Sequence, residues 1–155
     1  MRRYSITDER STALVAAALA PALRGGLMVG LSGDLGAGKT TFVRYLVAAA
    51  GGDTRAVSSP TYTLQHEYKL PNGLTVEHWD LYRLTSLPLE LEERTPASVV
   101  RLIEWPERCP EVIESLVWKL RLSVVNAEGG NRTLEVSGEG TEELSTRLKG
   151  IVSEG

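Results

Sequence analysis

The most constraining feature of this 155-residue chain is the glycine-rich octapeptide GDLGAGKT at residues 33–40. It satisfies the pattern G-x-x-x-x-G-K-[ST], whose glycines allow a tight backbone turn that directs several N–H groups at one anion. Residues 27–32 before it form a short apolar run typical of a buried strand. Residues 39–50 after it are helix-forming and end at a glycine pair. Strand, glycine loop and helix in this order predict a P-loop.

Two side chains of the loop have specific roles toward a polyphosphate. Lys39 places a positive charge against the β- and γ-phosphates, and Thr40 offers its hydroxyl to a magnesium ion. The helix that follows directs the positive end of its dipole at the same anion. The sequence therefore predicts a nucleotide triphosphate site, with ATP and Mg²⁺ as the expected ligands. The use made of the phosphate depends on the other polar residues.

Helices are also predicted outside this motif. Thr7, Asp8 and Glu9 favour a helix N-terminus, because capping side chains and acidic groups stabilise that end, and residues 8–23 are expected to be helical. A short helix is predicted at residues 87–94, where glutamates are frequent, and a last helix at residues 141–149.

The strand pattern predicts two antiparallel hairpins and one more buried strand. The hairpins join residues 62–69 with 74–81 and residues 116–126 with 131–137, and the strand covers 99–104. We therefore expect residues 1–155 to form a single P-loop NTPase domain of the α/β class. It would have three layers and a mixed sheet, to which the antiparallel hairpins are added.

Composition excludes several classes of protein. The formal net charge is −3, so the chain lacks the basic balance with which a protein grips a nucleic-acid backbone by itself. Its one cysteine, Cys109, cannot form a disulfide within the chain. The apolar stretch 13–23 contains Pro21 and is far shorter than the ~20 residues of a membrane span. We expect a cytoplasmic protein that does not associate with membranes.

Two acidic residues are candidates for the chemistry beside the phosphates. Glu104 follows an apolar strand, and open α/β sheets bind ligands at the carboxyl ends of their strands. Asp80 likewise ends a strand run. Magnesium on phosphates needs one or two protein oxygens, which such carboxylates can supply. Alternatively, either acid is a solvated loop residue, and Asp80 caps a turn or pairs with Arg83.

Four motifs together are similar to one family. They are GDLGAGKTT at 33–41, SPTYTL at 59–64, HWDLYRL at 78–84 and IEWPE at 103–107. In this order they resemble the TsaE family, formerly YjeE, small bacterial ATPases needed for the threonylcarbamoyladenosine modification of tRNA. The resemblance extends from Asp8 to about Val136. Between Tyr82 and Ile103 the chain is shorter and less helical than the family pattern.

The resemblance implies a role for each matching residue. Thr40 and Glu104 would ligate magnesium, Asp80 would orient water or the metal shell near the γ-phosphate, and Thr61 would lie in a switch-like loop that senses the γ-phosphate. Asp80, Glu104 and Thr61 are thus the expected catalytic residues. The expected nucleotide contacts are Glu9, Gly33, Asp34, Leu35, Gly36, Ala37, Gly38, Lys39, Thr40, Thr41 and Arg132.

The resemblance also implies a function. The chain would be a slow ATP hydrolase that resets the complex of TsaD and TsaB between rounds of tRNA modification, and would meet tRNA only through that complex. Two alternatives stay open: a small-molecule P-loop kinase, and a nucleotide-sensing interaction module without useful turnover. A GTPase is disfavoured, because the chain has no Asn-Lys-x-Asp run.

Several other side chains have two interpretations. His78 is a proton carrier or a buried histidine with satisfied hydrogen bonds, and Arg83 is an arginine finger, a partner contact or a member of a surface ion pair. Three aromatic residues form either a partner surface, where such residues concentrate, or part of the core: Trp79, Tyr82 and Trp105.

Overall fold

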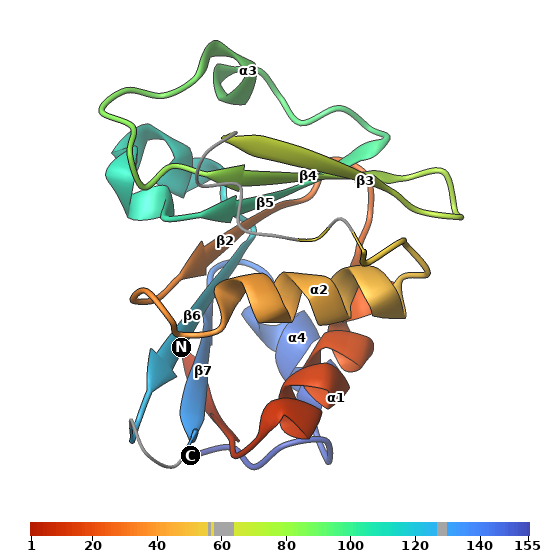
Figure 1. The fold of residues 1–155 in the computed structure, drawn as a ribbon, viewed down its shortest axis with the longest axis vertical. Helices are drawn as coiled ribbons and strands as arrows, with labels where there is room; N and C mark the ends of the chain where they lie inside the picture. Colours follow the sequence, from red (N-terminus) through yellow and green to blue (C-terminus); the bar gives the residue numbers. More distant parts are fainter. Residues whose placement is uncertain (56, 58–63, 127–129) are drawn as a thin grey trace.

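The computed structural model describes residues 1–55, 57, 64–126 and 130–155. A seven-stranded mixed sheet forms its centre, in the order β1-β7-β6-β2-β5-β4-β3 (Figure 1). Strands β6, β2, β5 and β4 run parallel to one another. Three pairings are antiparallel: β3 with β4, β7 with β6, and β1 with β7. The strands are β1 (Arg2–Ile6), β2 (Met28–Ser32), β3 (Gln65–Lys69), β4 (Thr75–Asp80), β5 (Val99–Glu104), β6 (Trp118–Val124) and β7 (Arg132–Ser137).

The α/β class, the mixed sheet and both hairpins are confirmed. β3 pairs with β4, and β6 pairs with β7, within the predicted ranges. Strand β1 was not predicted, although Tyr4 and Ile6 alternate with polar residues in the way a half-buried strand requires. It pairs with β7 along the edge of the sheet. Five residues give a weak signal when the pairing partner lies more than a hundred residues away.

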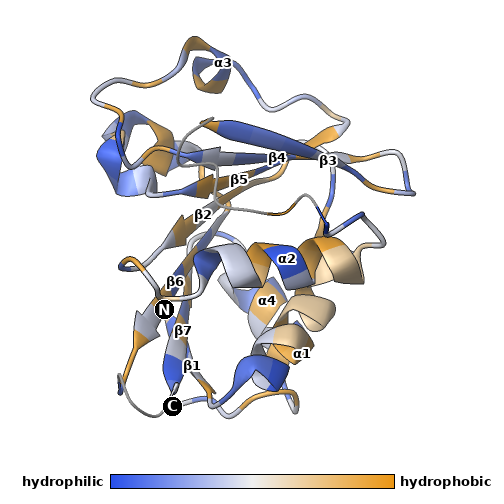
Figure 2. Cartoon of the chain, in the orientation of Figure 1, coloured by the Kyte–Doolittle hydropathy of each residue, from blue (hydrophilic) through white to orange (hydrophobic). Residues whose placement is uncertain are grey.

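Three helices cover one face of the sheet: α1 (Glu9–Leu19), α2 (Lys39–Ala49) and α4 (Thr141–Leu148) (Figure 1). Their apolar sides and those of the strands form the main core, whereas the edge strand β3 is largely hydrophilic (Figure 2). The helix predicted at 8–23 ends at Leu19 and continues as a 3₁₀ turn, Ala20–Ala22. Pro21 explains the change, because it has no N–H to donate to the preceding turn.

The opposite face is covered by short segments only: α3 (Leu89–Glu92) and the 3₁₀ turns η2 (Pro106–Arg108) and η3 (Pro110–Ser115). Their apolar residues form a second, smaller core with Met28, Trp79 and Ile103. The helix predicted at 87–94 is thus a single turn, since Pro88 precedes it and Pro96 follows soon after. The third layer of the expected architecture therefore contains no long helix among the described residues.

The parallel strands bring three distant segments to one edge. Leu31 pairs with Glu104 across β2 and β5, and Glu104 pairs with Asp80 across β5 and β4. The carboxyl ends of all three strands therefore lie beside the start of α2. Within the part of the chain that the structure describes, no helix has the length and apolar character needed to cross a membrane.

Candidate functional site

The loop at residues 33–38 connects β2 to α2 in a conformation that requires glycine. Gly33 has φ 141° and Gly38 has φ 104°, values that side-chain-bearing residues rarely adopt. A Cβ at Gly33 would lie 2.3 Å from the Leu122 carbonyl oxygen, so the loop passes directly against β6. The first helical residue after this loop is Lys39, as the motif predicts.

Lys39 is held by the loop itself. Its Nζ donates hydrogen bonds to the carbonyl oxygens of Gly33 at 2.5 Å and Asp34 at 3.1 Å, and lies 4.6 Å from the centre of the Trp105 ring. Burial lowers the pKa of this ammonium below its ordinary value, and the nearby carboxylates of Glu104 and Asp80 act in the opposite direction. Lys39 is therefore a largely desolvated cation next to two acids.

The two acids lie side by side at the ends of their strands. Asp80 is 3% exposed and Glu104 is 2% exposed. The Asp80 Oδ1 accepts a hydrogen bond of 2.8 Å from the backbone N–H of Tyr82, which fixes the turn after β4. The Glu104 Oε2 lies 2.5 Å from Nε2 of His78. Buried carboxylates need compensating partners, and Lys39 and His78 supply part of that compensation.

These groups border one cavity of about 530 Å³. Most of its lining comes from the P-loop, the start of α2 and the ends of β4 and β5. The lining residues are Leu35, Gly36, Gly38, Lys39, Thr40, Thr41, Asp80, Tyr82, Arg83, Glu104, Trp105 and Arg132. The structure thus brings the P-loop segment together with Asp80, Glu104 and Arg132, which lie far from it in the sequence.

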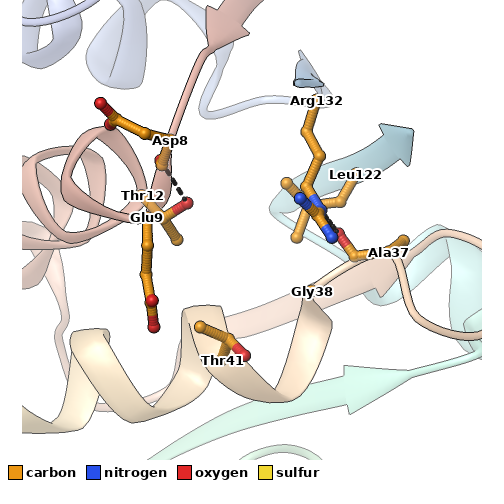
Figure 3. Close-up of a pocket in the computed structure, with 8 residues that line it drawn as sticks. All are labelled: Asp8, Glu9, Thr12, Ala37, Gly38, Thr41, Leu122 and Arg132. Carbon is orange, nitrogen blue, oxygen red and sulfur yellow. Dashed lines mark hydrogen bonds between the residues drawn. The ribbon is translucent and has the colours of Figure 1, made fainter. Parts of the chain in front are cut away.

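A second cavity of about 240 Å³ adjoins the first, and Gly38, Thr41 and Arg132 line both. Glu9 extends into it from the start of α1, and Arg132 faces it from β7 across the opening (Figure 3). The Arg132 Nε donates to the Ala37 carbonyl oxygen at 2.8 Å, so this arginine also braces the P-loop. The other lining residues are Asp8, Thr12, Ala37 and Leu122.

The remaining predicted residues are placed as follows. Gly33 and Asp34 line neither cavity, but their carbonyl oxygens accept from Lys39. Leu35 is exposed at the tip of the loop. Thr61 lies outside the described residues. Sequence reasoning did not assign Asp8, Thr12 or Leu122 to the site. Thr12 follows Glu9 by three residues on one helix, and this spacing is the signal that would have linked Thr12 to Glu9.

The donor set suits a magnesium ion that is bound mainly by phosphate. Within residues 1–55, 57, 64–126 and 130–155, no group of three or more His, Cys, Asp or Glu side chains could hold a metal ion by itself. Thr40 and Glu104 nevertheless line the same cavity, and one or two protein oxygens are enough when phosphate and water complete the octahedron. The residues present therefore fit a nucleotide-bound Mg²⁺.

The sequence as a whole is similar to known proteins. The profile of the family "Threonylcarbamoyl adenosine biosynthesis protein TsaE" matches residues 6–134. The tRNA threonylcarbamoyladenosine biosynthesis protein TsaE of Bacillus subtilis is 34% identical over 137 residues, which cover 87% of this chain and 83% of that protein. The protein of the same name from Rickettsia conorii is 39% identical over 108 residues, but the match covers only 61% of its length.

The fold agrees with this similarity. The crystal structure of Bacillus subtilis YdiB superposes with a TM-score of 0.68 at 27% sequence identity, and the match covers 96% of each chain. The similarity of fold therefore extends over nearly the whole chain.

Proposed function

Because the chain belongs to the TsaE family of threonylcarbamoyl adenosine biosynthesis proteins, we propose that it binds ATP with Mg²⁺ and hydrolyses it in tRNA modification. One observation carries the nucleotide part of the proposal. The P-loop cation Lys39 and the two buried carboxylates of Asp80 and Glu104 converge on one cavity. Two acids this close to a triphosphate are tolerable only with a cation between them.

In this proposal the backbone of residues 36–41 and the ammonium group of Lys39 hold the phosphates. Lys39 exchanges the carbonyl oxygens of Gly33 and Asp34 for phosphate oxygens, and Thr40 and Glu104 hold the ion. A magnesium ion held there would supply positive charge that offsets the negative charge of the phosphates. The smaller cavity between Glu9 and Arg132 is the place for the nucleoside, since it continues from the phosphate cavity through Gly38 and Thr41.

Hydrolysis is the second part of the proposal. Asp80 orients the attacking water or the metal shell, because it borders the cavity beside Lys39 and its carboxylate is already oriented by Tyr82. The nucleotide state would act on the complex of TsaD and TsaB, and ATP hydrolysis would reset that complex between rounds. A loop held by a γ-phosphate and released on hydrolysis is a general route to such control, and Thr61 is the proposed member of that loop.

Calorimetric titration with ATP, ADP and GTP, each with and without Mg²⁺, tests the nucleotide site. We expect Mg²⁺–ATP to bind, and Lys39→Ala to weaken it about 10-fold or more, because the variant loses charge-assisted hydrogen bonds to phosphate. Lys149→Ala is the matched control, since it removes an exposed lysine that lines neither cavity. Equal ATP affinity in wild type and Lys39→Ala would refute the site, and a preference for GTP would refute the base assignment.

A further inference from the structure

A row of hydrogen-bonded polar side chains extends from Glu104 into the hairpin of β3 and β4. The His78 Nε2 lies 2.5 Å from the Glu104 Oε2, and the His78 Nδ1 lies 3.3 Å from the Tyr68 hydroxyl. The Tyr68 hydroxyl lies 3.4 Å from the His66 Nδ1. His78 is 0% exposed and Tyr68 is 4% exposed, so these two hydrogen-bonded side chains are buried away from solvent.

Strand pairing explains why these side chains meet. His66 pairs with His78 across β3 and β4, and Asp80 pairs with Glu104 across β4 and β5. Side chains two positions apart on a strand share a face, so His78 lies on the same face of the sheet as Asp80 and Glu104. This is also the face covered by α2, to which the P-loop leads.

The hydrogen bonds that join Glu104, His78 and Tyr68 have one consistent donor-to-acceptor direction. When Glu104 is ionised its carboxylate only accepts, so the His78 Nε2 then donates to it. In a neutral imidazole the other nitrogen then accepts, and the Tyr68 hydroxyl donates to it. The tautomer of His78 is thus set from both sides, and the position of Glu104 Oε2 is set by a ring that cannot turn without losing two buried hydrogen bonds.

We propose that His78, oriented by Tyr68, is a positioning residue that fixes the Glu104 carboxylate for the divalent ion of the bound nucleotide. The proposal depends on the function proposed above, in which Glu104 is a metal ligand. The hydrogen bond from His78 engages Oε2, and in this proposal Oε1 is the oxygen that ligates the cation. Partners of this kind orient metal-ligating groups in many proteins, and their loss costs about 10–100-fold in metal affinity.

Two amide substitutions separate this role from simple core packing. The nitrogen of a glutamine side chain takes the place of Nε2, whereas that of an asparagine takes the place of Nδ1. His78→Gln therefore keeps a donor toward Glu104, and His78→Asn removes it while leaving a polar side chain. Tyr68→Phe removes only the hydroxyl. The readout is the Mg²⁺ concentration that half-saturates its effect on ATP binding, measured by calorimetry, with ATP binding in EDTA as the internal reference.

We expect His78→Asn to raise this Mg²⁺ concentration about 10-fold. His78→Gln should stay within about 3-fold of wild type, Tyr68→Phe should shift it in the same direction as His78→Asn but less, and ATP binding in EDTA should be unchanged in all three. A purely structural histidine would lower metal-free and metal-dependent binding together. That result, or equal shifts in His78→Asn and His78→Gln, would overturn the proposal.

Two further measurements keep the test decisive. If His78→Asn does not fold, as judged by thermal unfolding, the comparison of His78→Gln with Tyr68→Phe replaces it: a larger shift in Tyr68→Phe supports the proposal, and equal values contradict it. Glu104→Gln distinguishes the two levels of inference. If wild type shows no Mg²⁺ dependence, or Glu104→Gln leaves it unchanged, the metal site itself fails; if both behave as expected and the His78 variants match wild type, only the positioning role fails.

Discussion

At the scale of single residues, the site is organised around charged side chains that are buried close together. Lys39 donates hydrogen bonds to two carbonyl oxygens of its own loop, and glycine loops of this type generally offer amide N–H groups to an anion. A phosphate would thus replace neutral acceptors by charged ones, which makes stronger hydrogen bonds. Motif matching predicts the identity of Lys39, but only the structure shows that it is buried and stacked near Trp105.

Asp80 is expected to contribute to the rate of ATP hydrolysis more than to the binding of ATP. Asp80→Asn keeps the size of the side chain and an acceptor for the Tyr82 N–H, but it removes the charge that we propose orients water or the metal shell. We expect the rate of ATP hydrolysis to fall about 100-fold, while the affinity for Mg²⁺–ATP changes by less than about 3-fold.

Single-turnover hydrolysis and equilibrium binding, measured on the same preparation, separate these effects. Thr146→Ala, a substitution on the exposed side of α4, serves as the control for handling and stability. Loss of binding in proportion to loss of rate would place Asp80 in ground-state binding instead of catalysis.

At the scale of helices and strands, the residues near each end of a helix explain where it begins and how long it is. Helix α1 begins where its residues predict, because the Asp8 side chain caps it: its Oδ1 accepts from the Ser11 N–H at 2.7 Å. By contrast, α3 is only one turn long, and the other segments that cover the same face of the sheet, η2 and η3, are 3₁₀ turns. Glutamates favour a helix there, but prolines at both ends limit its length.

The cap of α1 predicts a pH-dependent stability effect. Hydrogen bonds from Ser11, chiefly from its backbone N–H, hold the pKa of the Asp8 carboxyl below its ordinary value of 3.8. The unfolded chain therefore binds this proton at a higher pH than the folded chain does. The stabilisation is present above pH 3.8 and is lost as the pH falls through the lower folded-state pKa.

We accordingly expect Asp8→Ala to lower the Tm by about 2–4 °C at pH 7 and by less near pH 2.5. Asp8→Asn should retain most of the Tm at pH 7, because asparagine is also a good capping residue. Thermal unfolding of the nucleotide-free chain across this pH range provides the measurement. A Tm difference between wild type and Asp8→Ala that stays constant down to pH 2.5 would show that the carboxylate is not the source of the effect.

At the scale of the whole molecule, strand order creates the site. The P-loop follows β2, Asp80 ends β4 and Glu104 ends β5, and the order β2-β5-β4 makes these three ends neighbours. The added strands β7 and β1 extend the sheet on the other side, where β7 brings Arg132 to the P-loop. Both cavities lie at this edge of the sheet, which is where we propose that a partner contacts the nucleotide.

The proposed regulatory role predicts that turnover depends on partners. We expect slow ATP hydrolysis by the chain alone and at least about 10-fold faster hydrolysis when TsaB and TsaD are both added, because a partner can supply charge that stabilises the transition state. Phosphate release assays with each partner singly and together provide the measurement, and Lys39→Ala supplies the background rate. Rapid hydrolysis by the isolated chain, unchanged by both partners, would contradict the gating role.

The sequence by itself determined the features that depend on residues close together along the chain. The strand–loop–helix of the phosphate site follows from glycine spacing, the start of α1 from its cap, and the hairpins from alternation around turn residues. The four motifs together also identified the family, and the family profile confirms it. Each of these signals lies within a few residues, so no knowledge of the fold is needed to detect it.

Only the tertiary structure decided which distant residues meet. The contact between His78 and Glu104, the second cavity between Glu9 and Arg132, and the pairing of β1 with β7 all join segments that are far apart in sequence. Such contacts depend on strand order and register, and a shift by one residue would move every side chain of a strand to the other face. Local residue patterns do not encode that register; packing of the complete sheet against α1, α2 and α4 does.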